Sequence, residues 1–283
     1  MMVNTLSENS QKVTKTQLAK KLGIARSSLY YRHKRPAIDE EVKKQIESVL
    51  TDNPAYGHKR IALALKLNKK RILRVMKKFG IQPSKRRVKK PRKKEDEGKP
   101  ATKYQNLIKG FIPTRRDQVW VSDFTYLRFG ERFIYLATIM DLFTREIVGF
   151  NISRFHNSEL VLGALEDALK KNTPPDYLHS DQGTEYDSQK YTNLAEGLGI
   201  TISMSAKSSP WENAYQESFY SQFKVDLGRT DRFSNLGELI ETISGTLLYY
   251  NTKRIHTALK MSPGEYRKRS QEMKDCPSRK MGT

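Results

Sequence analysis

The arrangement of apolar runs after about residue 117 restricts the fold more than any other feature of this sequence. Their spacing predicts three consecutive strands, at 119–127, 133–140 and 147–152, joined by short turns. Helices and strands then alternate: a helix beginning near Asn157, a strand at 177–180, a helix at 188–197, a strand at 200–204 and a helix at 212–227. The chain therefore builds a mixed five-stranded sheet with helices.

Three antiparallel strands followed by alternating helices and strands is the order of a ribonuclease-H-like α/β fold, which we expect for residues 115–228. An apolar stripe from Leu236 to Tyr250 predicts a closing helix, and with it a C-terminal helical extension over residues 229–283. The residues before 115 lack strand periodicity and predict all-α modules.

The charge of the chain lies almost entirely in its first part. The sequence has 52 Lys and Arg against 31 Asp and Glu, a net charge of +21. Residues 1–114 hold 30 of the basic and 9 of the acidic side chains, which leaves residues 115–283 neutral. A basic surface kept only for solubility would not need this segregation, so we expect the first part to bind a polyanion such as nucleic acid.

Residues 1–36 have the spacing of a helix-turn-helix unit. Leu18 and Leu22 lie four residues apart, Gly23 supplies a turn, and Leu29 returns to the core from a second helix, with Pro36 closing the unit. A small helical pair that binds nothing has the same pattern. The side chains expected to face a DNA groove are Arg26, Ser27, Ser28 and Tyr31.

A second module, of helix-turn-helix or winged-helix type, is expected at residues 37–82. Asp39 is the expected N-cap of its first helix, a short helix follows at 58–67, and Asn68 caps a third that stops near Gly80. The third helix is strongly basic, which is typical either of a solvated face or of contact with DNA phosphates. Its expected DNA-binding residues are Lys69, Lys70, Arg71 and Arg74.

Residues 83–114 are predicted to be a basic linker between the helical modules and the mixed sheet. The stretch from Lys85 to Lys99 carries nine basic residues and almost no apolar ones. We expect it to lie along phosphates when DNA is present. The residues assigned to this contact are Arg86, Arg87, Lys89 and Lys90.

Three acids of residues 115–283 lie on or next to expected strands and helices of the sheet, whose strand ends are common ligand-binding positions. Asp123 interrupts an apolar strand, Asp181 ends another, and Glu217 lies on a helix, with 35 residues between Asp181 and Glu217. An acid within an apolar strand is disfavoured unless it is paired. Three carboxylates suit Mg²⁺ or Mn²⁺, and two such ions support chemistry at a phosphodiester. Each acid alone is more simply a cap or a surface charge; together they predict a metal site.

Neighbouring residues leave other assignments open. Asp141, Glu185 and Asp187 are competing acids near strand ends. Lys224 shares a helical face with Glu217, which predicts contact with a DNA phosphate, although a solvent-exposed lysine has the same pattern. His179 precedes Asp181 by two residues and is either near the site or simply packed.

The sequence predicts a soluble cytoplasmic protein that associates with DNA. Cys276 is the only cysteine, so disulfides are excluded within the chain. No apolar run is long enough to cross a bilayer, and the N-terminus lacks the pattern of a signal peptide. We therefore expect no membrane partner.

Several motifs of this chain resemble those of the OrfB-type transposases of bacterial insertion sequences, members of the DDE retroviral-integrase superfamily. The resemblance rests on Val121–Tyr126, on His179–Gly183, on Asn213–Phe219 with Lys224, and on Tyr250–Leu259. Upstream, 56–61 resembles the start of the family's second helix-turn-helix module.

The resemblance implies that Asp123, Asp181 and Glu217 are a catalytic triad that binds two Mg²⁺. It further implies cleavage at the ends of an insertion sequence and attack of the freed 3′-OH on another phosphodiester. The implied partners are double-stranded DNA, as terminal inverted repeats and target, further copies of the chain on paired ends, and an upstream helix-turn-helix protein. The alternatives are a helix-turn-helix regulator without catalysis and a nuclease that cuts without joining.

Overall fold

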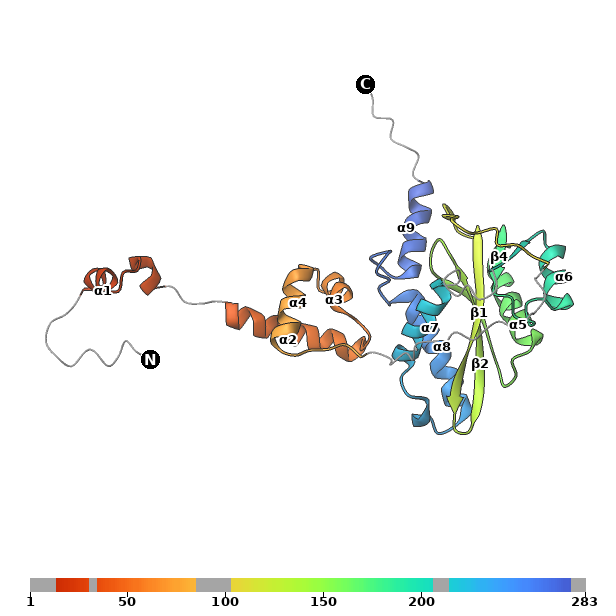
Figure 1. The fold of residues 1–283 in the computed structure, drawn as a ribbon, viewed down its shortest axis with the longest axis horizontal. Helices are drawn as coiled ribbons and strands as arrows, with labels where there is room; N and C mark the ends of the chain where they lie inside the picture. The colour runs from red at the N-terminus through yellow and green to blue at the C-terminus, as the bar shows by residue number, and fades with distance from the viewer. Residues whose placement is uncertain (1–13, 31–34, 85–102, 206–213, 276–283) are drawn as a thin grey trace, which may run out of the picture. The chain divides into compact units, whose positions relative to one another are not determined.

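The computed structural model describes residues 14–30, 35–84, 103–205 and 214–275 (Figure 1). The chain divides into two compact units, Met1–Gln45 and Ile46–Thr283. Within the described ranges, no helix combines the length and the apolar character that crossing a lipid bilayer requires.

The first unit contains a short helix and a helical turn. Helix α1 spans Lys15–Lys21 and starts in a capping box, in which Thr14 Oγ1 accepts from the backbone N–H of Gln17. Gly23 makes the expected turn with a φ of 63°. The predicted second helix is only the four-residue 3₁₀ helix Arg26–Leu29, and Leu22 is 58% exposed. A 3₁₀ segment this short presents fewer side chains to a groove than the predicted α-helix.

Helix α2 spans Arg35–Asp52 and corrects two expectations about where helices begin and end. Pro36 does not close a unit but stands in the first turn of α2, where its missing N–H has no helical partner to lose. Asp39 is therefore not the N-cap; it lies within the helix and is 2% exposed.

Two further helices, α3 at His58–Ala64 and α4 at Lys69–Lys78, form a small helical pair. Asn68 caps α4 as predicted, since its Oδ1 accepts from the backbone N–H of Lys70 at 2.8 Å. Gly80, with a φ of 66°, follows the end of α4 as expected. The short helix ends at Ala64, earlier than the predicted residue 67.

The predicted mixed sheet is confirmed, with the order β3-β2-β1-β4-β5. Its strands are β1 Val119–Phe129, β2 Arg132–Asp141, β3 Ile147–Ser153, β4 Tyr177–Ser180 and β5 Thr201–Met204. The first three pair antiparallel, whereas β4 pairs parallel with both β1 and β5. This is the ribonuclease-H-like arrangement that the sequence order predicts. It places β1 at the centre of the sheet.

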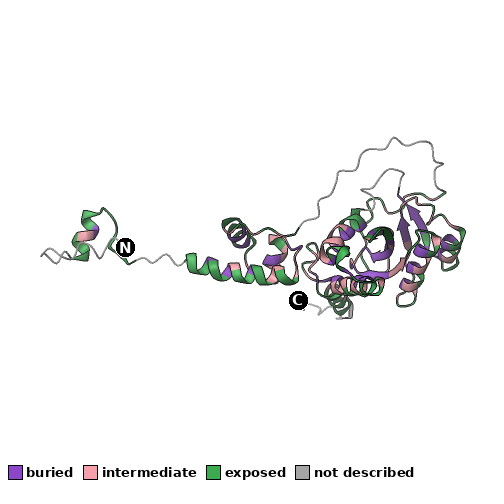
Figure 2. Ribbon diagram, turned by 90° about the horizontal axis from the view of Figure 1, so that it is seen from below, coloured by how far each residue is buried: buried purple, intermediate pink, exposed green. Residues whose placement is uncertain are grey.

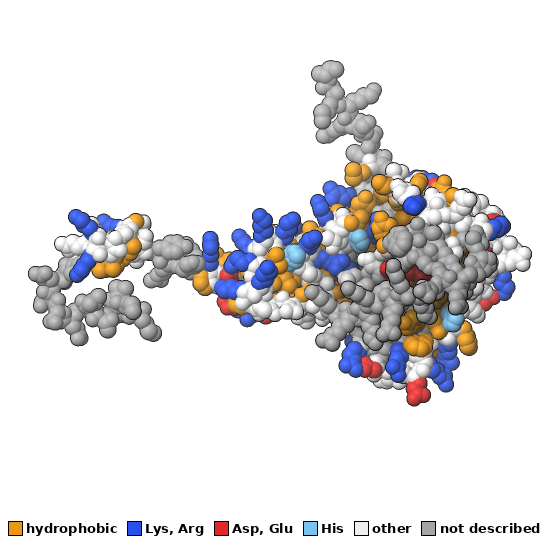
Figure 3. All heavy atoms as spheres, viewed as in Figure 1, with side chains coloured by type: hydrophobic (Ala, Val, Ile, Leu, Met, Phe, Trp, Pro, Cys, Tyr) orange, Lys and Arg blue, Asp and Glu red, His pale blue; other side chains and the backbone are white. Residues whose placement is uncertain are grey.

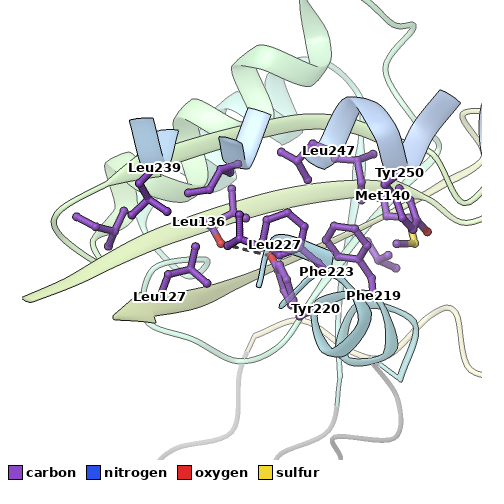
Figure 4. Packing of buried hydrophobic residues seen from close by; sticks show 14 of the residues in the cluster. Leu127, Leu136, Met140, Phe219, Tyr220, Phe223, Leu227, Leu239, Leu247 and Tyr250 are labelled. Carbon is purple, nitrogen blue, oxygen red and sulfur yellow. Dashed lines mark hydrogen bonds between the residues drawn. The ribbon is translucent and has the colours of Figure 1, made fainter. Parts of the chain in front are cut away.

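Helices cover both faces of the sheet, and each face has its own apolar core (Figure 2). The helices are α5 Ser158–Leu169, α6 Gln189–Gly197, α7 Ala214–Leu227, α8 Leu236–Thr252 and α9 Pro263–Asp275. Leu165 of α5 and Ala195 of α6 lie in the core of one face. On the other face, Phe219 and Phe223 of α7 pack with Leu247 and Tyr250 of α8 against β1 and β2 (Figure 4).

The segment before β1 follows the edge of the sheet. The backbone N–H of Met204 donates to the carbonyl of Gln105, and that of Leu107 donates to Ser203 Oγ at 2.9 Å. Tyr104 donates to Glu196 on α6. These residues, which we assigned to the linker, are thus tied to β5 and α6.

A buried arginine joins the tail of the chain to α7 and to the loop before α3. Arg254 is 1% exposed; its Nε donates to Asp226 at 2.5 Å and its Nη2 to Gln222 at 2.9 Å. Arg60 donates to the same Gln222 oxygen at 3.0 Å. The hydroxyl of Tyr56 accepts from the backbone N–H of Ile255 at 2.7 Å. The motifs 56–61 and 250–259, which contain none of the three acids, therefore meet at one buried polar junction.

We predict that Asp226→Asn strongly destabilises the protein. The change leaves the Arg254 guanidinium buried without its carboxylate, and breaking such a pair costs about 3 to 5 kcal/mol. Urea unfolding followed by circular dichroism measures the loss. Asp231→Asn is the matched control, because its pair with Arg229 is exposed and contributes little. Equal midpoints for the two variants would contradict the prediction.

Candidate active site

The sheet register brings two of the three acids side by side. The last residue pair between β1 and β4 is Val121 with His179, in parallel register. Asp123 lies two residues further along β1, and Asp181 lies two residues further along the chain, directly after the end of β4 at Ser180. The backbone N–H of Phe124 donates to Asp123 at 2.8 Å, and that of Gly183 donates to Asp181 at 3.1 Å. These two carboxylates are therefore both oriented by the backbone.

Glu217 lies in the first turn of α7, which is anchored to the sheet next to Asp123. Gln216 is fully buried, and its Nε2 donates to the carbonyls of Val121 at 2.8 Å and Thr138 at 3.3 Å. The Tyr220 hydroxyl donates to the carbonyl of Asp123 at 2.6 Å. Two polar side chains of α7 thus hold the helix on the strand that carries Asp123.

Gln216 and Tyr220 were not predicted from the sequence to be part of the site. The signal was available, because these residues are four apart and share a helical face with Phe219 and Phe223, which are buried. A polar pair on an apolar helix face needs hydrogen-bond partners, and the carbonyls of β1 and β2 supply them.

The pKa of Asp123 responds to the charges of both other acids. Burial raises the pKa of Asp123 to about 8, with further rises from the negative charges of Asp181 and Glu217. The hydrogen bond from Phe124 and the cation of Lys224 lower the pKa in part. Burial also raises the pKa of Asp181, helped by the charge of Glu185. The site therefore has an excess of negative charge that one lysine offsets only partly.

This excess of negative charge indicates whether the residues present would suit a metal ion. Among the described residues, no three His, Cys, Asp or Glu side chains are placed closely enough to enclose a metal ion as they stand. The donor set nonetheless fits a hard divalent cation, because it consists of carboxylate oxygens that repel one another. A cation among them would relieve that repulsion.

The competing acids have structural roles of their own. Asp141 is fully buried and accepts from the backbone N–H and the hydroxyl of Thr144, both at 2.7 Å, which shapes the predicted turn after β2. Glu185 lies 3.2 Å from His156 and also affects Asp181. Asp187 is exposed. Asp141 and Glu185 are thus each engaged in contacts of their own.

His179 is packed within the sheet. It is fully buried, and its Nδ1 lies 2.9 Å from Ser203 Oγ on the neighbouring strand β5. The packed alternative for this histidine agrees with the structure.

The residues expected to contact DNA fall into three groups. Arg26, Ser27 and Ser28 are exposed on the 3₁₀ helix, whereas Tyr31 lies outside the described residues. Arg86, Arg87, Lys89 and Lys90 also lie outside them. All four assigned cations of α4 are exposed, namely Lys69, Lys70, Arg71 and Arg74. Lysines and arginines project visibly from the helical segments in Figure 3.

Lys224 lies on α7 at the edge of the site. Its Nζ is 5.1 Å from the centre of the Tyr126 ring, and its charge reaches Asp123. The expected shared position with Glu217 on one side of α7 agrees with this arrangement.

The order of this sheet and the helices on its two faces are those of a ribonuclease-H-like core. The integrase core domain family matches the chain at residues 113–210, and a second integrase core domain family matches residues 198–263. The chain is 32% identical over 278 residues to InsK of insertion sequence element IS150 from Escherichia coli K12, with 94% of this chain and 97% of that protein covered. It is 33% identical over 251 residues to the transposase for insertion sequence element IS904 from Lactococcus lactis, with 83% and 98% covered.

The chain belongs to the insertion-sequence transposases of the DDE integrase superfamily. As an enzyme it is a DNA transposase, a polynucleotidyl transferase.

We predict that Asp123→Asn raises the melting temperature of the metal-free protein, by a margin that grows from pH 5 to pH 8. The pKa of Asp123 is raised to about 8 in the folded state, against about 3.9 in an unfolded chain. Below about pH 4 this acid is protonated in both states and does not lower the free energy of unfolding. As pH rises from about 4 towards 8, only the unfolded chain loses the proton, so the folded protein progressively loses stability. Asparagine has no proton to lose.

Thermal unfolding in EDTA across this pH range measures the margin, at about 2 to 4 °C per kcal/mol. Asp187→Asn, an exposed acid with the same change, is the control. Added Mg²⁺ should then raise the melting temperature of the wild type more than that of Asp123→Asn. A margin independent of pH would count against the raised pKa.

Proposed function

We propose that Asp123, Asp181 and Glu217 are the catalytic acids and together hold two Mg²⁺ or Mn²⁺ ions. The observation that carries this proposal is that Asp123 and Asp181 each follow the last β1–β4 residue pair by two residues, while Gln216 and Tyr220 anchor the helix of Glu217 to β1. When bound, such ions activate the attacking oxygen and stabilise the leaving oxygen of a phosphodiester. The proposed reactions are cleavage at insertion-sequence ends and transfer of the freed 3′-OH to another DNA strand.

The chain's own residues orient the reacting groups. Hydrogen bonds from Phe124 and Gly183 fix one oxygen of each aspartate, so their remaining oxygens face the reaction. Gln216 and Tyr220 hold α7, and with it Glu217, against β1. Lys224 binds the phosphate next to the scissile bond, where its charge lies close to Asp123. A regulator without catalysis would need none of this arrangement.

DNA recruitment is assigned to the basic helical segments. The exposed cations of α4 supply affinity for phosphates without reading bases. We extend the same role to Arg26, Ser27, Ser28 and Tyr31, and to the basic stretch 85–99. Because two insertion-sequence ends must be held together, several copies of the chain would assemble on paired ends, with an upstream helix-turn-helix protein as a further partner.

We predict that Glu217→Gln abolishes Mg²⁺-dependent cleavage and joining while leaving DNA affinity within about twofold. The change keeps the size of the side chain and removes one of the three charges. Strand cleavage and strand transfer are measured on DNA that carries the element's own ends. Glu241→Gln, an exposed acid on α8, is the matched control and should retain wild-type activity. Cleavage by Glu217→Gln would refute the assignment; nicks without joining by the wild type would indicate a nuclease.

We predict that the double variant Lys70→Ala, Arg71→Ala binds DNA more weakly and with a smaller salt dependence. Each phosphate that a cation neutralises adds about 0.9 to the slope of log affinity against log salt, so removing both cations reduces the slope by roughly 1.8. Fluorescence anisotropy at several salt concentrations gives the slope. Lys170→Ala, Lys171→Ala at the end of α5 removes the same charge and should leave the slope unchanged. Equal slopes in both double variants would exclude α4 from the interface.

A further inference from the structure

The hairpin of β1 and β2 extends well past the strand that carries the second acid. Strand β4 pairs with β1 only over Val119–Val121, whereas β1 and β2 remain paired as far as Phe129 and Arg132. One face of this extension is covered, since Leu127 and Ile134 are each 4% exposed in the core beneath α7 and α8. The opposite face is left with large aromatic side chains.

We define the hairpin strip as Tyr126, Phe133, Tyr135 and Phe155. Tyr126 is 57% exposed, Phe133 46% and Phe155 70%. The rings of Tyr126 and Phe133 are 5.3 Å apart and nearly perpendicular, and the ring of Tyr135 lies 5.0 Å from His156. A cross-strand aromatic pair stabilises a hairpin by itself, yet that role does not require the rings to be half exposed. An exposed aromatic surface of this kind is typical of a binding site.

The strip adjoins the three acids through Tyr126 and Lys224. Tyr126 follows Asp123 by three residues on β1, about 10 Å along an extended strand, and points to the opposite face of the sheet. The two side chains are therefore connected around the edge of β1 that lies beyond its pairing with β4. Lys224 Nζ lies 5.1 Å from the Tyr126 ring, and the charge of Lys224 reaches Asp123. One lysine thus links the acids to the first ring of the strip.

An open groove continues from this point between the hairpin and the second half of α7. Its lining includes Tyr126, Arg128, Lys224 and Arg229. From Glu217 to Leu227, α7 rises about 15 Å, enough for about four stacked nucleotides at 3.4 Å each. The direction of α7 therefore carries the groove away from the acids.

Positive charge surrounds the strip. Arg128 is exposed on β1, Arg132 on β2 and Arg154 just after β3. The nearby acids are largely engaged, since Asp231 pairs with Arg229 and Glu185 lies 3.2 Å from His156. Glu131 is the exposed acid of the turn. Aromatic rings interleaved with cations are the surface that binds unpaired nucleotides, by base stacking together with phosphate contacts.

We propose that the hairpin strip and the adjoining groove bind an unpaired DNA strand that leaves the scissile phosphate, with a base stacked on Tyr126. This inference rests on the proposed function of the acids and adds the form of the substrate: the nucleotides next to the cut are separated from their complement and held on protein rings. Lys224 and Arg128 contact the phosphates of the same strand.

The test uses the full-length protein in EDTA, so that binding is measured without catalysis. The probe is a duplex that ends in a four-nucleotide single-stranded extension, with 2-aminopurine at one of the four positions. Wild-type protein should quench the fluorescence at one or more positions and bind this DNA at least fivefold more tightly than a blunt duplex. Tyr126→Leu should lose the quenching and the preference, whereas Tyr126→Phe should retain both.

Circular dichroism melts establish that Tyr126→Leu is folded, and Phe133→Leu provides a second variant at the same strip should it not be. Unchanged quenching in folded Tyr126→Leu, or equal wild-type affinity for blunt and extended DNA, would overturn the proposal that the strip binds an unpaired strand. Those outcomes are independent of the proposed catalytic acids, which the Glu217→Gln cleavage assay tests separately on the element's ends.

Discussion

The repulsion among three carboxylates on and beside the central strand is the constraint on which this structure depends. Asp123 sits in β1, between β2 and β4, where burial and the charges of Asp181 and Glu217 raise its pKa to about 8. Such an arrangement is unfavourable for folding and persists only because surrounding contacts hold it. Under the proposed function, a divalent cation bound between the acids would relieve this repulsion.

The contacts that oppose this repulsion come mainly from α7. Gln216 and Tyr220 bond to backbone carbonyls of β1 and β2, so the helix cannot move away from Asp123 without leaving buried polar groups unpaired. Phe219 and Phe223 add apolar packing on the same helix face (Figure 4). The same helix also presents Lys224 towards Tyr126, so that one element positions an acid, the proposed phosphate contact and the border of the groove.

Much of this arrangement could be predicted from local sequence. The short strands before Asp181 and around 201–204 were predicted correctly because apolar runs bounded by turn residues admit few alternatives. The start of α2 was not, because Pro36 is compatible both with a helix end and with a first helical turn. The sequence predicted an α-helix after Gly23, whereas Arg26–Leu29 forms only a four-residue 3₁₀ helix.

By itself, the sequence determined the order of the elements, the segregation of positive charge and the motifs in which the three proposed catalytic acids lie. These depend on periodicity, composition and spacing, which are local properties of a chain. Only the tertiary structure decided the strand register that sets Asp123 beside Asp181, the anchoring of α7 through Gln216 and Tyr220, and the burial of Arg254 against Asp226. Each joins residues distant in sequence, and such pairings follow from packing and hydrogen-bond satisfaction across the whole fold.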